Sequence, residues 1–166
     1  MSENQIISTL DELKSTYADL LENSLSKKQC IISKEYGELI TAMNLESRLV
    51  KKAEKQEQAL SESIQYFLRE KGIQSKLKLT VTETMRLVFD PSIKAILDEK
   101  RSQLEHKIHE LGRVNALNQE LIQQSLTFID FSLNLVTNDM DDVSTYSSSP
   151  DREKRTQQRN MFDTRA

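Results

Sequence analysis

The stretch LEHKIHELGRVNALNQELIQQSLTF, residues 104–128, decides the fold class. Its large apolar side chains recur at steps of seven or three residues: Leu104, Leu111, Val114, Leu121 and Phe128. On a helix this spacing places them along one face. The same rhythm starts at Ile93 and reaches Leu135, which predicts a helix over about 91–137, roughly 65–70 Å long. Such a helix is stable in water only if other helices cover its apolar face.

Two further long helices are predicted upstream, over about 3–33 and 35–70. The first has an apolar stripe that falters near Ser24 and restarts one residue out of register. Gly37 follows the slip, so we expect a break over residues 32–37, with one kinked rod as the alternative. The stripe before the slip consists of Ile6, Leu10, Leu13, Tyr17 and Leu20. The stripe after it consists of Ile32, Tyr36, Leu39, Met43, Val50, Ala53, Leu60, Ile64 and Phe67.

Helix punctuation is clear between residues 72 and 91. Gly72 suits the position just past a helix C-terminus. Thr80 and Glu83 have the spacing of a capping box, which predicts a short helix over about 80–88. Asp90 followed by Pro91 is a second start signal.

These elements predict an all-α protein: a long antiparallel helical hairpin or three-helix coiled-coil bundle over residues 1–137. Residues 35–70 are the expected antiparallel partner of the last helix. Residues 138–166 are rich in Ser and charge and poor in apolar side chains. Because such a segment buries too little area to offset its ordering entropy, we expect a flexible, disordered C-terminal tail.

Composition excludes several classes of protein. The 166 residues include only three Gly, two Pro and no Trp, which disfavours sheets. The net charge of −3 gives no electrostatic case for binding nucleic acid. No apolar run approaches the roughly 20 residues that a membrane helix needs, so no membrane insertion is expected. The N-terminus does not resemble a signal peptide, which makes the cytoplasm the expected compartment.

Catalytic and metal-binding patterns are also missing from the sequence. Cys30 is the single cysteine, so neither a disulfide nor a thiolate metal site is expected. His106 and His109 share a helix face at i and i+3, but no further His is available, and a solvated face is the better interpretation. No phosphate loop, dinucleotide fingerprint or nucleophile motif appears. We therefore expect neither an enzyme nor a cofactor.

The end of the last helix is more apolar than one partner helix requires. Leu121, Phe128 and Leu135 suffice for a two-helix seam. A second stripe is displaced around the helix and consists of Ile122, Leu126, Ile129, Leu133 and Val136, with Phe131 off both stripes. Leaving four or five such side chains in water forfeits about 6–15 kcal/mol, as much as a domain's whole stability. Either helix 3–33 covers this stripe, or a helix from another protein does.

The stretch NALNQELIQQSLTFIDFSLNL, residues 115–135, resembles the FlgN family of flagellar export chaperones. It is similar to the family's pattern N-x-x-N-Q-x-L-I-x-x-S-L near the end of the last long helix. Weaker similarity lies in YADLLE at 17–22, LITAMNLESRLVKKAEKQEQ at 39–58 and TVTETMRLVFDP at 80–91. The second of these departs from the family where Gln56–Gln58 stand in place of an expected Arg.

The resemblance implies a cytoplasmic chaperone without catalysis or cofactor. It would bind the terminal helices of the hook–filament junction proteins FlgK and FlgL and present them to the flagellar type III export gate. The family's cargo surface lies on the last part of the last helix and beyond, where the surplus apolar residues fall. The expected client-binding residues are Asn118, Leu121, Ile122, Leu126, Ile129, Phe131, Leu133, Val136, Met161 and Phe162.

Three matters stay open at this level. A self-associating structural coiled coil, in which the wide apolar arc closes a homodimer, is the alternative function. The sequence does not say which junction protein is the client, or whether the chaperone is a monomer or a dimer. It assigns no role to the C-terminal tail or to the Ser-rich patch at 144–149.

Overall fold

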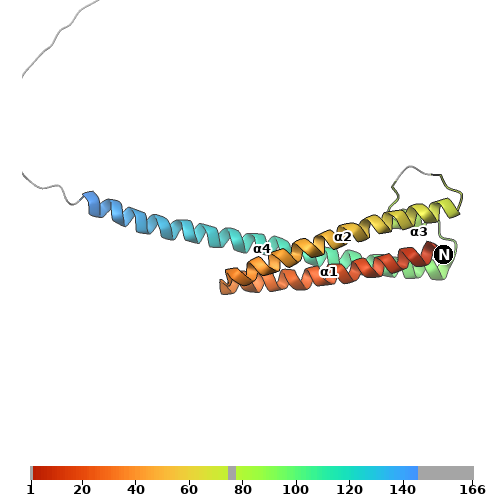
Figure 1. The fold of residues 1–166 in the computed structure, drawn as a ribbon, viewed down its shortest axis with the longest axis horizontal. Helices are drawn as coiled ribbons and strands as arrows, with labels where there is room; N and C mark the ends of the chain where they lie inside the picture. The colour runs from red at the N-terminus through yellow and green to blue at the C-terminus, as the bar shows by residue number, and fades with distance from the viewer. Residues whose placement is uncertain (1, 75–77, 146–166) are drawn as a thin grey trace, which may run out of the picture. The chain divides into compact units, whose positions relative to one another are not determined.

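The computed structural model describes residues 2–74 and 78–145, with side chains described as far as residue 137. Helices account for nearly all of these residues, and no strand occurs among them, which confirms the all-α prediction. The elements are α1 (Ser2–Ser33), α2 (Tyr36–Glu70), α3 (Val81–Met85) and α4 (Pro91–Thr145) (Figure 1). Two compact units divide the chain, Met1–Leu126 and Thr127–Ala166, and α4 contributes to both.

A turn at Lys34 and Glu35 separates α1 from α2, so residues 3–70 form two helices and not one kinked rod. Lys34 has φ 59°, and its N–H bonds to the Ile31 carbonyl at 3.3 Å. The N–H of Glu35 bonds to the Cys30 carbonyl at 3.0 Å. This is a Schellman ending, in which a left-handed residue satisfies the last carbonyls of a helix. The sequence pointed to Gly37 near the break, but Gly37 lies in the first turn of α2.

The other helix ends follow the local signals. Gly72 has φ 71°, and the pair Gly72 N–H to Arg69 carbonyl and Ile73 N–H to Leu68 carbonyl closes α2. Thr80 and Glu83 form the predicted capping box. Asp90 accepts the Ser92 N–H at 2.8 Å at the start of α4. Two bounds differ from the prediction: α3 ends at Met85 and not near 88, and α4 runs to Thr145 and not to about 137.

The apolar core of the first unit lies where the start of α1, the end of α2, α3 and the start of α4 meet. Phe67 is fully buried there, and Ile6, Leu10 and Leu97 are each 1% exposed. Burial of one such side chain stabilises the fold by about 1.5–3 kcal/mol, so this cluster is the main source of stability. The complete cluster is Ile6, Leu10, Ile64, Phe67, Leu68, Met85, Val88 and Leu97.

The first half of α2 departs from the predicted stripe. Tyr36, Met43 and Val50 are exposed, although the sequence placed them on the buried face. Ala42 is buried in their place, whereas Ala53, which the sequence did place on the stripe, is buried as expected. The Ala42 carbonyl accepts a hydrogen bond from the buried side chain of Asn23 in α1 at 3.0 Å. The side of α2 that meets α1 at this point is therefore the side of Ala42, and the large side chains are left exposed.

α4 runs along α1 in the same direction: residues further along α1 contact residues further along α4. Asp11 accepts a hydrogen bond from Lys100 at 2.8 Å, and Lys14 donates to Gln103 at 3.0 Å. The Lys100 ammonium also lowers the pKa of the Asp11 carboxyl. The sequence predicted residues 35–70 as the partner of this helix. In the structure α1 supplies these side-chain hydrogen bonds to α4.

Candidate functional site

Two asparagines of the NALNQ stretch hold α4 to α1. The hydroxyl of Ser24 donates to Asn115 Oδ1 at 2.6 Å. Asn118 Nδ2 donates to the Ser24 carbonyl at 2.9 Å and lies 3.2 Å from its hydroxyl oxygen. Ser24 is fully buried and Asn118 is 3% exposed. The apolar stripe of α1 is therefore interrupted at Ser24 by a buried, hydrogen-bonded polar contact and not by a gap in packing.

Asn118 consequently lies outside the exposed surface to which we had assigned it. Its Oδ1 is buried and has no hydrogen-bond partner among the described residues. Its side-chain hydrogen bonds are to Ser24 of the same chain, so the structure gives Asn118 an interhelical contact, and a client contact at this position stays a prediction. Leu121, one turn further along α4, is half-buried.

The contacts of Ser24 lie near the C-terminal end of α1. Ser24 contacts Asn115 and Asn118, and α1 ends nine residues later at Ser33. Within the first unit, these are the last hydrogen bonds between the side chains of α1 and α4 along α1 among the described residues.

Large apolar residues on α4 are exposed from Ile122 onward. In the first unit, Ile122 is 38% and Leu126 55% exposed. In the second unit, the exposed fractions lie between 45% and 63% for Phe128, Ile129, Phe131, Leu133, Leu135 and Val136. Phe128 and Leu135 were expected in a covered seam, and their exposure corrects that prediction. The apolar arc is therefore wider than the second stripe alone.

The polar side chains among these residues turn back onto the helix. The hydroxyls of Ser125, Ser132 and Thr137 each donate to the carbonyl four residues earlier, at 2.9 Å. Such bonds satisfy the hydroxyls within the helix itself. Asp130 is the one charged residue between positions 121 and 137. We call residues 122–136 of α4 the apolar face.

The sequence offered four further candidate residues, two histidines and a dipeptide near the C-terminus. Met161 and Phe162 lie outside the described residues. His106 and His109 are exposed, and His106 Nε2 lies 3.8 Å from a carboxylate oxygen of Glu110. The described side chains include no group of three metal-ligating residues that contains either histidine. Among the described helices, none is both long and apolar enough to cross a membrane.

A known protein family matches this chain. The family model described as FlgN protein matches residues 1–152, which is most of the chain. The chain belongs to the FlgN family. Its members are flagellar export chaperones, a class of binding protein and not of enzyme. No curated protein and no solved structure matches the chain significantly.

Within this FlgN protein the structure separates two roles that the sequence motif combined. The asparagines of N-x-x-N contact α1, whereas the Leu, Ile and Phe residues that follow are exposed. Sequence reasoning missed Ser24 and Asn23 because a Ser or Asn on a helix is ordinarily a surface residue. The available signal was their position, three and four residues after Leu20 on the same stripe.

Proposed function

We propose that this chain is a cytoplasmic chaperone that binds the terminal helices of FlgK and FlgL on the apolar face of α4. The supporting observation is the exposure of six large apolar residues between positions 128 and 136. An amphipathic helix laid along such a face buries its own apolar side at the same time. Shielding that side prevents client helices from associating with one another.

The energetics suit a complex that has to be released. Burying four or five of the exposed side chains contributes about 6–15 kcal/mol. Ordering a client segment that is unfolded before it binds costs about 2–5 kcal/mol. The difference allows firm binding in the cytoplasm together with handover to the export apparatus. The expected client-binding residues are Leu121, Ile122, Leu126, Ile129, Phe131, Leu133 and Val136, with Met161 and Phe162 as a second contact.

A titration with purified FlgK and FlgL tests this proposal. We expect each client that binds to form a stoichiometric complex by size exclusion with light scattering. The variant Ile129→Asp Leu133→Asp removes two apolar side chains, which is worth about 3–6 kcal/mol or at least a 100-fold loss of affinity. The matched control is Ile96→Asp Ile108→Asp, because these two isoleucines are also exposed on α4, at 41% and 43%.

The alternative function makes a different prediction in the same experiment. If the apolar face closes a homodimer, the wild type elutes as a dimer, the Ile129→Asp Leu133→Asp variant elutes as a monomer, and neither client binds. That result would refute the chaperone proposal for this face. Equal affinity in the variant and the wild type would place the client elsewhere on the chain.

A further inference from the structure

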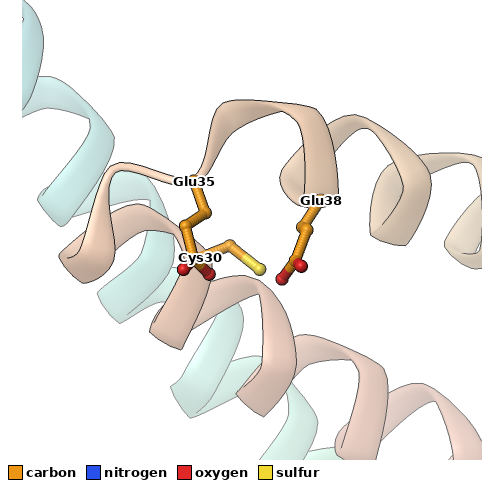
Figure 2. A group of neighbouring side chains, drawn as sticks. All are labelled: Cys30, Glu35 and Glu38. Atoms are coloured by element: carbon orange, nitrogen blue, oxygen red, sulfur yellow. The ribbon is translucent and has the colours of Figure 1, made fainter.

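Three side chains with metal-ligating atoms converge at the turn between α1 and α2. Cys30 lies in the last turn of α1, Glu35 in the turn itself and Glu38 in the first turn of α2. The Cys30 Sγ and one carboxylate oxygen from each glutamate all lie within 4.8 Å of one another. Figure 2 shows the sulfur directed toward the Glu38 carboxylate, with the Glu35 carboxylate beside the other end of the Cys30 side chain.

The backbone of the turn fixes this arrangement. The hydrogen bond from the Glu35 N–H to the Cys30 carbonyl, 3.0 Å long, folds the chain back so that residue 35 returns to residue 30. Glu38 follows Glu35 at a spacing of three residues, which places both carboxylates on one side of the helix start. The three ligands are therefore brought together by a Schellman ending and not by side-chain flexibility alone.

The burial of the three groups differs in a way that suits a ligand site. Cys30 is 5% exposed, and its thiol has no hydrogen-bond partner among the residues whose side chains are described. Glu35 and Glu38 are exposed, so a small ion reaches the sulfur from the carboxylate side. Packing as a small apolar residue explains the burial of the cysteine. It does not explain why the buried sulfur lies within 4.8 Å of a carboxylate oxygen of each glutamate.

We propose that Cys30, Glu35 and Glu38 bind a divalent cation of the zinc class. A thiolate favours zinc and softer ions over Ca²⁺ and Mg²⁺, which prefer oxygen ligands throughout. Three protein ligands leave a fourth position for water in a tetrahedral site. Zinc bonds of about 2.3 Å to sulfur and 2.0–2.2 Å to oxygen bring ligand atoms to about 3.5 Å from one another. The ligand atoms already lie within 4.8 Å of one another, and the exposed glutamate side chains have the freedom to close the remaining distance.

Binding has a defined proton balance and a structural consequence. The thiol loses its proton to solvent as the sulfur–metal bond forms, so one proton is released for each ion bound. The bound ion then links the last turn of α1 to the first turn of α2. That link reinforces a helix start at which Glu35 provides no side-chain cap.

The test uses the full-length protein, reduced and freed of metal with a chelator. Titration calorimetry with Zn²⁺ is expected to give one equivalent bound and one proton released. Co²⁺ is expected to give the near-ultraviolet absorption of a cobalt–thiolate bond. Cys30→Ser abolishes that absorption, and Glu35→Gln Glu38→Gln weakens Zn²⁺ binding at least 10-fold. The control His106→Ala His109→Ala, on the other pair of candidate ligands, binds as the wild type does.

Several results would overturn the proposal. These are the absence of stoichiometric binding, a cobalt–thiolate band that persists in Cys30→Ser, or loss of binding in the histidine control. A change of less than threefold in Glu35→Gln Glu38→Gln would also overturn it. Because both glutamates are exposed, this double variant keeps the test valid even if replacement of the buried cysteine prevents folding.

Discussion

Replacement of Asn118 by leucine tests the account of the contact between α1 and α4. Leucine has nearly the same shape as asparagine but no polar atoms. The change removes two interactions of Nδ2 with Ser24, at 2.9 and 3.2 Å, worth about 0.5–1.5 kcal/mol each. It also removes the buried, unpartnered Oδ1, whose desolvation costs about 1–3 kcal/mol.

These contributions nearly cancel, and the leucine adds buried apolar area. The Ser24 hydroxyl keeps its donor bond to Asn115, so no new donor is left without a partner. We therefore expect Asn118→Leu to change the free energy of unfolding by no more than about 1 kcal/mol. Asn118→Asp has the opposite effect, since it places a carboxylate against the Ser24 carbonyl, and costs at least about 3 kcal/mol.

Urea denaturation followed by far-ultraviolet circular dichroism measures both changes. Asn44→Leu is the control for the substitution itself, because Asn44 is an exposed residue of α2, and it should leave the denaturation midpoint unchanged. A loss of more than about 2 kcal/mol in Asn118→Leu would refute the reasoning, because it would mean that Oδ1 is hydrogen-bonded in the folded protein.

Two further predictions concern a helix end and a tyrosine. Gly72→Ala places a Cβ on a residue in the left-handed conformation and should destabilise the fold by about 1 kcal/mol. Gly112→Ala, inside α4 with open space around it, should stabilise the fold by about 0.5–1 kcal/mol. Urea denaturation measures both changes, and equal effects would contradict the role of Gly72. Tyr17 is partly buried, and its hydroxyl donates a hydrogen bond to Glu57 at 2.8 Å; together these raise the pKa of Tyr17 to about 12. The contribution of this raised pKa to stability is therefore complete below pH 10 and is lost as the pH rises toward 12. A spectrophotometric titration of the four tyrosines should show one late transition that Tyr17→Phe removes; a late transition that persists in this variant would belong to another tyrosine.

Much of the fold follows from sequence because its signals act within one helical turn. Gly72, the pair Thr80 and Glu83, and Asp90 before Pro91 each satisfy backbone groups a few residues away. Their effect does not depend on the rest of the molecule. The surplus of apolar residues after Leu121 is likewise a property of that segment alone. The all-α fold class follows in the same way from the helical spacing of apolar residues along the chain.

Tertiary structure decided which residues are covered. Ser24 and Asn118 are buried because each finds its hydrogen-bond partner more than 90 residues away, and no local pattern encodes that pairing. Tyr36 and Met43 are exposed because Ala42 lies on the side of α2 that meets α1. The approach of Cys30 to Glu38 depends on the left-handed conformation of Lys34. A lysine does not predict that conformation from sequence, whereas a glycine such as Gly72 does. The sequence by itself thus determined where helices start and stop and how much apolar surface they have, whereas the meeting of distant helices decided which of that surface stays exposed.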